Sequence, residues 1–163
     1  MRAAFSLRGV QFSYRGQPAL CGIDLDLPRG KRIALLGANG SGKSTLLRLL
    51  DGLQFPAAGT ITALDAPLSA AALQDEATAI AFRRRVGFVF QNPEVQLFCP
   101  SVFDELAFGP LQLSWPKPQI RARVAEIMAE FGLTPLADRP PHRLSGGEKK
   151  RVALASVLIL DPE

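Results

Sequence analysis

The sequence has little of the chemistry on which several functional classes depend. Among its 163 residues there are two cysteines, one histidine, one tryptophan and one tyrosine. Cys21 and Cys99 lie far apart without metal-binding or redox spacing, and the lone His142 excludes a histidine-rich metal site. We therefore interpret both thiols as buried or structurally ordinary.

Long apolar segments are also absent. The longest run, Val152 to Leu160, is interrupted by Ser156 and is shorter than the roughly 18–20 apolar residues that a membrane span needs. Arginines break up the N-terminal segment, so no signal segment is predicted there. The sequence is typical of a cytoplasmic chain.

The charge balance is mildly basic, with 19 Lys and Arg against 15 Asp and Glu and a net charge of +4. Short basic runs at Arg83–Arg85 and Lys149–Arg151 lack interleaved aromatic residues, whereas nucleic-acid binding needs a broader basic surface. A solvated surface is the favoured interpretation, and no nucleic-acid partner is predicted. Hydrophobic residues make up 47% of the chain, which is enough for the packed core of one domain.

An antiparallel hairpin is predicted near the N-terminus, followed by buried strands. Phe5–Val10 and Leu20–Leu27 have strand character, and Tyr14–Pro18 between them is typical of a turn. Ile33–Leu36 and Val86–Phe90 are continuous apolar runs, which are typical of strands buried on both faces of a parallel sheet.

Helices alternate with these strands. They are predicted over residues 42–50, 70–85, 101–110, 116–131 and 145–160, with a further short strand over 59–62. Ser101 with Asp104, and Ser145 with Glu148, form capping-box patterns at two of the helix starts. A β hairpin followed by alternating strands and helices predicts an α/β fold with a parallel-sheet core.

A glycine-rich segment, Gly37–Ser44, fits the pattern G-x-x-x-x-G-K-[ST] between a predicted buried strand and a predicted helix. Its glycines let consecutive N–H groups converge on phosphate oxygens, and the helix N-terminus adds the positive end of its dipole. In this pattern Lys43 reaches the β- and γ-phosphates and the Ser44 hydroxyl coordinates Mg²⁺. A glycine-rich turn without a ligand is the alternative, and the flanking elements favour a nucleotide site. The predicted phosphate-binding residues are Gly37, Asn39, Gly40, Ser41, Gly42, Lys43, Ser44 and Thr45.

A second motif, Leu144–Glu148, reads LSGGE and opens the predicted helix over 145–160. Here the sequence resembles the ATP-binding cassette (ABC) family, whose signature is LSGGQ, and Glu148 stands where glutamine is usual. A hydroxyl and two glycine N–H groups at a helix start form a second anion cradle. On its own the motif is interpretable as a simple helix cap, but its occurrence beside a P-loop favours the signature.

The resemblance implies a fold, a ligand and a partner. The implied fold is a P-loop NTPase with a parallel-sheet core, an N-terminal antiparallel β subdomain and a helical subdomain carrying the signature. Two cassettes pair head to tail in this family, as a homodimer or a heterodimer, so each signature acts on the nucleotide of the partner. The signature residues are Ser145, Gly146, Gly147 and Glu148. ATP and Mg²⁺ are the implied cofactors.

Two further positions match the family pattern. Tyr14 follows the first strand, where the family places an aromatic residue that stacks on adenine, although a turn tyrosine is otherwise more often a packing residue. Gln91 ends the Val86–Phe90 run and matches the glutamine that contacts Mg²⁺ and the attacking water. The implied catalytic residues are therefore Gln91 and Lys43, and the implied Mg²⁺ ligands are Ser44 and Gln91.

Three segments narrow the subfamily. Gln91–Phe98 and Asp104–Pro110 look like the cassettes of energy-coupling-factor importers, and Asp138–Arg143 is similar to the cobalt and nickel members. In these systems an integral membrane subunit docks on the cassette, here near Gln91–Gly109, which implies a peripheral position at the cytoplasmic face of the membrane. Cobalt or nickel is the implied substrate, and a vitamin is the alternative.

Three phenylalanines fall within the docking segment: Phe98, Phe103 and Phe108. They either serve the groove for the membrane subunit or fill the core. Because a single phenylalanine is more often a core residue, the core is the favoured interpretation for each.

The family pattern extends beyond the residues present. After the signature helix the resemblance implies a hydrophobic strand ending in Asp-Glu (Walker B), a D-loop and a switch histidine, so residues 1–163 are interpreted as a partial ABC ATP-binding domain. Leu158–Asp161 imitates that strand, but alignment from the signature makes it the end of the helix. Without the strand beside Val86–Phe90, apolar edges are expected to be exposed and to promote aggregation.

Two functional classes remain open. One is the ATP-hydrolysing subunit of a membrane importer, and the other is a non-catalytic nucleotide-binding or interaction module. Residues 1–163 alone are expected not to sustain ATP turnover, because they lack the carboxylates that hold Mg²⁺ and polarise water. A soluble cassette of DNA repair or translation would carry long insertions between Lys43 and Ser145, and none is present.

Overall fold

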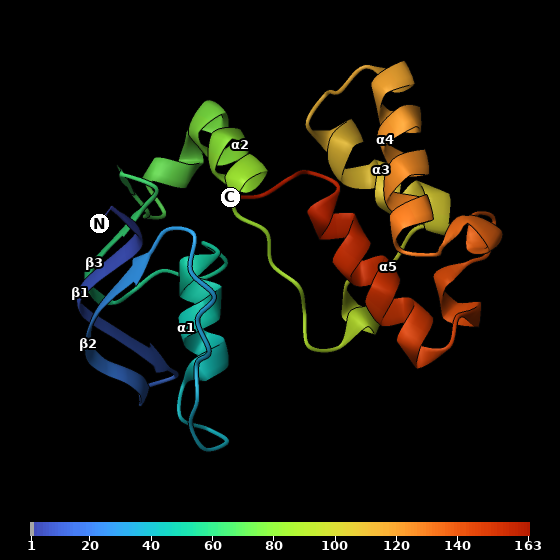
Figure 1. Cartoon of the computed structure of the whole chain (residues 1–163). Helices are drawn as coiled ribbons and strands as arrows, with labels where there is room; N and C mark the ends of the chain where they lie inside the picture. Colours follow the sequence, from blue (N-terminus) through green and yellow to red (C-terminus); the bar gives the residue numbers. More distant parts are fainter. Residues whose placement is uncertain (1) are drawn as a thin grey trace. The chain divides into compact units, whose positions relative to one another are not determined.

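The computed structural model describes residues 2–163, which divide into two compact units, one up to Ala79 and the other from Ile80 to Glu163 (Figure 1). The boundary falls within the helix α2 (Glu76–Arg85). None of the helices in this part of the chain is long and apolar enough to cross a membrane.

The first unit contains a four-stranded antiparallel sheet in the order β2-β1-β3-β4. Its strands are β1 (Ala3–Tyr14), β2 (Gln17–Pro28), β3 (Ala58–Ala63) and β4 (Ala66–Pro67). Arg15 and Gly16 alone connect β1 to β2, with φ values of 48° and 84°. Positive φ at both central residues is typical of the type I′ turn, whose twist matches that of a hairpin. The predicted hairpin is confirmed, with longer strands than the apolar pattern indicated.

The helix α1 (Lys43–Leu50) lies against this sheet (Figure 1). Leu46 and Leu49 of α1 are buried, as are Leu7 and Val10 of β1. A helix of 8 residues is marginal in water by itself, so the burial of this apolar face stabilises it. The sheet thereby holds the N-terminal end of α1, where the glycine-rich loop ends.

The second unit is mainly helical. It contains α3 (Val102–Gln112), α4 (Lys117–Glu130) and α5 (Gly146–Leu158). Their buried apolar residues form one core cluster, which includes Val102, Leu106, Ile120, Val124, Ile127, Leu133, Val152 and Ile159. α5 ends at Leu158, in agreement with the prediction that the Leu158–Asp161 run is the end of this helix and not a strand.

Helix caps follow the sequence signals in most places. Ser101 and Ser145 are the N-cap residues of α3 and α5, and each side chain accepts an N–H three residues along the chain. α3 continues past its predicted end at Pro110, because Leu113 donates its N–H to the Gly109 carbonyl and closes one more turn.

The helix predicted over residues 70–85 is broken in the structure. A 3-10 turn, η1 (Ala72–Gln74), is followed by Asp75 in an extended conformation and then by α2. Asp75 Oδ2 accepts the Thr78 N–H at 2.8 Å and the Thr78 hydroxyl at 2.6 Å. A residue that caps in this way must leave helical geometry, so Asp75 begins α2 rather than continuing a longer helix.

Two segments predicted as parallel strands, Ile33–Leu36 and Val86–Phe90, are not paired in any sheet, and this part of the prediction is corrected. The strand that the resemblance places beside Val86–Phe90 is not among these residues, and an extended segment without a neighbour has no ladder partners. Apolar side chains are accordingly exposed: 89% for Leu36, 53% for Ile33 and 41% for Val89.

Candidate nucleotide-binding site

The glycine-rich loop leads directly into α1, as the motif predicts. Gly42 is the N-cap residue of α1 at a φ of 87°, a left-handed conformation that residues with side chains disfavour. A Cβ atom at this position would lie 2.7 Å from the carbonyl oxygen of Ala19 in β2. Glycine satisfies both constraints, so Gly42 fixes where the helix starts relative to the sheet.

Lys43 folds over the same loop. Its Nζ atom donates to the carbonyl oxygens of Gly37 at 2.8 Å and Ala38 at 2.6 Å. Ser44 follows on the exposed side of the first turn of α1, where backbone N–H groups carry the positive end of the helix dipole. An ammonium group beside a helix N-terminus fits an anionic ligand, for which phosphate oxygens would replace the two carbonyls as acceptors for Nζ.

Tyr14 is attached to α1 through its hydroxyl. The hydroxyl donates to Gln54 Oε1 at 2.9 Å and accepts from Thr45 Oγ1 and Arg48 Nη1, each at 3.4 Å. These bonds, above all the one from Thr45, lower the pKa of Tyr14. The residue is 38% exposed, and its ring packs edge-on against Phe12 at 4.9 Å between centroids. The ring predicted to stack on adenine is therefore held beside the P-loop helix.

The predicted signature forms the exposed start of α5. Ser145 Oγ accepts the Glu148 N–H at 3.3 Å, and Glu148 Oε2 accepts both the N–H and the hydroxyl of Ser145 at 2.7 Å. This reciprocal pair is the predicted capping box, and it lowers the pKa of Glu148. A Cβ atom on Gly146 or Gly147 would meet nothing within 4 Å. The two glycines thus leave the backbone of the helix start open to a partner.

The segment around Gln91 is fastened to α5. Gln91 itself is exposed and follows Phe90, whose N–H donates to Gln96 Oε1 at 3.1 Å. Gln96 Nε2 donates to the Ala153 carbonyl at 2.8 Å and to Ser156 Oγ at 3.1 Å. The role of Gln96 is not predicted from the sequence, because nothing local distinguishes this amide from a surface glutamine.

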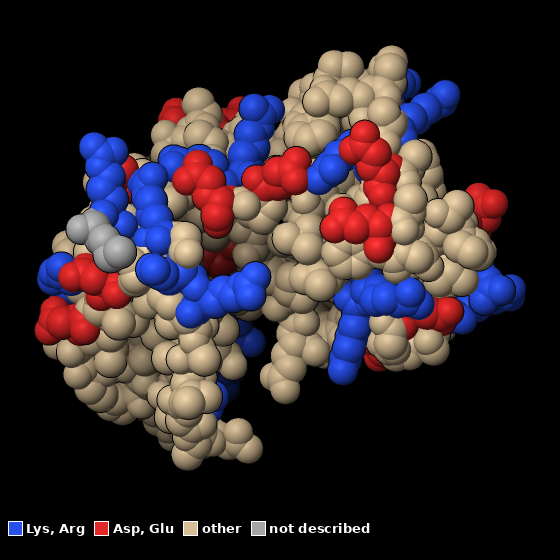
Figure 2. All heavy atoms as spheres, in the orientation of Figure 1, with Lys and Arg blue, Asp and Glu red and all other residues tan. Residues whose placement is uncertain are grey.

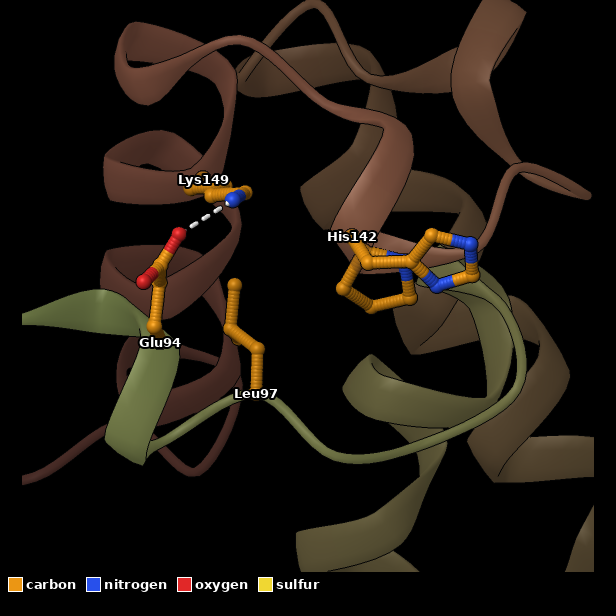
Figure 3. A pocket seen from close by; sticks show the side chains of 5 residues that line it. Glu94, Leu97, His142 and Lys149 are labelled. Carbon is orange, nitrogen blue, oxygen red and sulfur yellow. Dashed lines mark hydrogen bonds and ion pairs between the residues drawn. The ribbon is translucent and has the colours of Figure 1, made fainter.

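A hollow of about 310 Å³ lies beside this attachment, lined by Glu94, Leu97, Pro141, His142 and Lys149. Figure 3 shows the Glu94 carboxylate joined to Lys149 on one side of the hollow and His142 on the other. The Nζ–Oε1 distance is 2.6 Å, and Lys149 lowers the pKa of Glu94. The ion pair ties the 3-10 turn η2 (Pro93–Val95) to α5.

Comparison with known proteins identifies the family. The profile of the ABC transporter family matches residues 20–163. The chain belongs to this family. It is 80% identical over 163 residues to the nickel import ATP-binding protein NikO of Rhodobacter capsulatus, covering 100% of this chain and 64% of NikO. It is 42% identical over 164 residues to the energy-coupling factor transporter ATP-binding protein EcfA2 of Methanospirillum hungatei, covering 100% of this chain and 40% of that protein.

A solved structure shares the fold. The structure of CbiO1 from Clostridium perfringens, described as part of the ABC transporter complex CbiONQ, matches with a TM-score of 0.82 at 36% identity. The match covers 99% of this chain and 63% of CbiO1. The predicted fold class, an ABC cassette with an antiparallel β subdomain and a helical subdomain, is confirmed. The chain spans less than two thirds of the length of these relatives.

The predicted site residues fall into two groups, and each group lies within one of the two compact units of this chain. Tyr14 and the P-loop belong to the first unit, whereas Gln91 and the signature belong to the second. Within residues 2–163 no group of three His, Cys, Asp or Glu lies close enough to hold a metal ion. The Mg²⁺ ligands Ser44 and Gln91 therefore stay predictions, in which phosphate oxygens would complete the coordination.

The phenylalanines of the segment that resembles the ABC docking region differ from one another. Phe103 packs against the core cluster, as predicted. Phe98 is 67% exposed and Phe108 39% exposed, and their rings meet edge-on at 4.9 Å between centroids. The core interpretation is wrong for these two. The buried Glu105 holds the backbone at Phe98, since its Oε2 accepts the N–H groups of Phe98 and Cys99.

Charged side chains are distributed rather than gathered on the face of the cassette drawn in Figure 2, where Lys and Arg lie among Asp and Glu. In the first unit Arg8 pairs with Asp26 at 2.8 Å and Arg29 with Asp65 at 2.7 Å. Such interspersed charge is typical of a solvated surface. The absence of a nucleic-acid partner stays a prediction.

Proposed function

We propose that this chain is the ATP-binding part of a subunit that hydrolyses ATP to drive an energy-coupling-factor type importer for nickel or cobalt ions. The observation that carries the proposal is the P-loop itself, in which Gly42 sets the start of α1 and the Lys43 ammonium lies over the loop at 2.6–2.8 Å from two carbonyls. The 80% identity to a nickel import protein and the cobalt- and nickel-like run Asp138–Arg143 support the proposed substrate.

The P-loop would bind the phosphates. Lys43 would transfer its hydrogen bonds from the loop carbonyls to the β- and γ-phosphates, while the N–H groups at the start of α1 bind further oxygens. Ser44 and Gln91 would hold Mg²⁺, which neutralises the charge that develops on the phosphates. Tyr14 would orient the adenine by stacking. Gln91 would also orient the attacking water.

A second cassette would complete the site. Two features at the start of α5 support a signature that acts on the nucleotide of the partner. The backbone at the two glycines is open to a partner, and an intact capping box holds Ser145 in place. Either a second copy of this chain or a related cassette would supply the matching signature.

An integral membrane subunit would dock on the second unit. The exposed pair Phe98 and Phe108 supports this position, since two large aromatic rings in contact at the surface mark an interaction site, and the buried Glu105 carboxylate holds the backbone at Phe98. The chain would then act from the cytoplasmic face of the membrane.

Uptake of radioactive nickel and cobalt by cells that express the complete gene product with its neighbouring membrane subunits tests the proposal. We expect ATP-dependent uptake of nickel, cobalt or both, which Lys43→Ala abolishes and Lys43→Arg reduces. Uptake of neither ion, or uptake that Lys43→Ala leaves unchanged, would contradict the proposed function. ATP binding without any transport would instead favour the non-catalytic module.

A further inference from the structure

One glutamine joins the segment that carries Gln91 to the helix that begins at the signature. Gln96 uses both ends of its amide: Oε1 accepts the Phe90 N–H at 3.1 Å, and Nε2 donates to the Ala153 carbonyl at 2.8 Å. The bond from Phe90 fixes the backbone immediately before Gln91. The bond to Ala153 fixes Gln96 on the middle of α5, 57 residues further along the chain.

A second contact restrains the same segment. Glu94 and Lys149 form an ion pair at 2.6 Å, with the lysine side chain 16% exposed and the glutamate 63% exposed (Figure 3). Lys149 lies next to Glu148, the last signature residue, so this pair reaches α5 within its first turns. The hollow of about 310 Å³ lies beside this pair.

We propose that Gln96 is a positioning residue that makes Gln91 and the signature move as one body. The inference rests on the proposed function, in which Gln91 serves the nucleotide of its own chain and the signature serves that of the partner. Gln96 then transmits a displacement of Gln91 at one site to Ser145 at the other. It is the half-buried amide, rather than the Glu94–Lys149 pair, that carries the coupling, because the Glu94 side chain is 63% exposed and an ion pair open to water contributes little.

A residue that only holds α5 in place, without coupling it to Gln91, would make similar contacts in the folded protein. Arg123 is such a residue and serves as the matched control. Its guanidinium donates to the Ile159 carbonyl at 3.3 Å and to Asp161 Oδ1 at 2.6 Å, so it ties α4 to the far end of α5. Loss of either clamp weakens the packing of α5. Only loss of Gln96 releases the backbone beside Gln91.

The test measures ATP hydrolysis by the complete gene product against ATP concentration. For Gln96→Met, which keeps the length but removes both hydrogen-bonding ends, we expect kcat to fall about tenfold, the Hill coefficient to fall to about 1, and ATP binding to change less than about twofold. Gln96→Glu keeps an acceptor for the Phe90 N–H, so its kcat and its Hill coefficient should stay closer to those of the wild type. Arg123→Met should lower the melting temperature as much as Gln96→Met does but leave kcat and the Hill coefficient unchanged.

A distance measurement decides the point without turnover. Spin labels at the exposed Val95 and Lys150, with Cys21 and Cys99 replaced by serine, should give a narrow distance distribution that Gln96→Met broadens and Arg123→Met does not. Wild-type kinetics and a narrow distribution in Gln96→Met, or equal effects of Arg123→Met, would overturn the inference. Absence of hydrolysis in the wild type, or hydrolysis by Lys43→Ala, would instead contradict the proposed function, and the distance distributions would still decide the role of Gln96.

Discussion

Replacement of Glu105 by leucine tests how the exposed aromatic pair is held. The Glu105 residue is only 4% exposed, and its Oε2 atom accepts the N–H of Phe98 at 2.9 Å and that of Cys99 at 2.8 Å. Both bonds are partly buried, and a hydrogen bond to a charged acceptor contributes about 1.5–3 kcal/mol. Leucine has a similar volume but no acceptor, so we expect the free energy of unfolding to fall by about 3 kcal/mol.

Thermal unfolding of the complete gene product measures this loss. At about 2–4 °C per kcal/mol, the melting temperature of Glu105→Leu should fall by about 6–12 °C. Glu105→Gln keeps an oxygen acceptor and should lose less. Asp104→Asn, at the exposed neighbouring position, is the matched control and should shift the midpoint by about 2 °C or less. Equal melting temperatures for Glu105→Leu and Asp104→Asn would refute the reasoning.

Three further predictions concern the nucleotide site and the signature. Gly42→Ala places a methyl group against the Ala19 carbonyl, so ATP binding should weaken about tenfold and the free energy of unfolding should fall by about 1–3 kcal/mol, measured by calorimetric titration and thermal unfolding. Tyr14→Phe keeps the ring but loses the hydrogen bonds to Gln54 and α1. Calorimetric titration should therefore show a smaller loss of ATP affinity for Tyr14→Phe than for Tyr14→Ala. Equal losses for the two variants would count against stacking. Hydrogen bonds from Ser145 lower the pKa of Glu148 below its ordinary value of 4.5, so its contribution to stability is complete above that value and is lost as the pH falls through the lower folded pKa. Glu148→Gln should remove this pH dependence from unfolding measured between about pH 3 and 7, and an unchanged pH profile would contradict the assignment.

The features that the sequence predicted correctly are those whose causes lie within a few residues. The turn residues Tyr14–Pro18 between two strand-like runs are enough to predict the hairpin, and Ser145 with Glu148 is enough to predict a capping box. The glycine-rich loop that leads into α1 belongs to the same class, because the glycines, Lys43 and the helix start form one continuous segment. Local patterns of this kind also predict the residues of the nucleotide site.

The features that the sequence could not reveal depend on contacts between distant residues. The role of Gln96 depends on its hydrogen bond to the Ala153 carbonyl of α5, 57 residues away. The burial of Glu105 depends on how the loop at Phe98 folds back on α3. The strand prediction for Ile33–Leu36 was wrong for the same reason, since an apolar run becomes a strand only where a neighbour supplies its hydrogen bonds. Residue type and spacing along the chain do not predict such distant partners.

Calorimetric titration of the complete gene product with Mg-ATP tests the central claim most directly, with wild type and Lys43→Ala compared side by side. The account predicts that the wild type binds ATP and that Lys43→Ala binds it at least about tenfold more weakly, because the proposed site assigns the phosphates to the ammonium that lies over the loop. Circular dichroism should show the same helix content in both proteins. Equal affinity of the two proteins for ATP, or no binding by the wild type, would contradict the account.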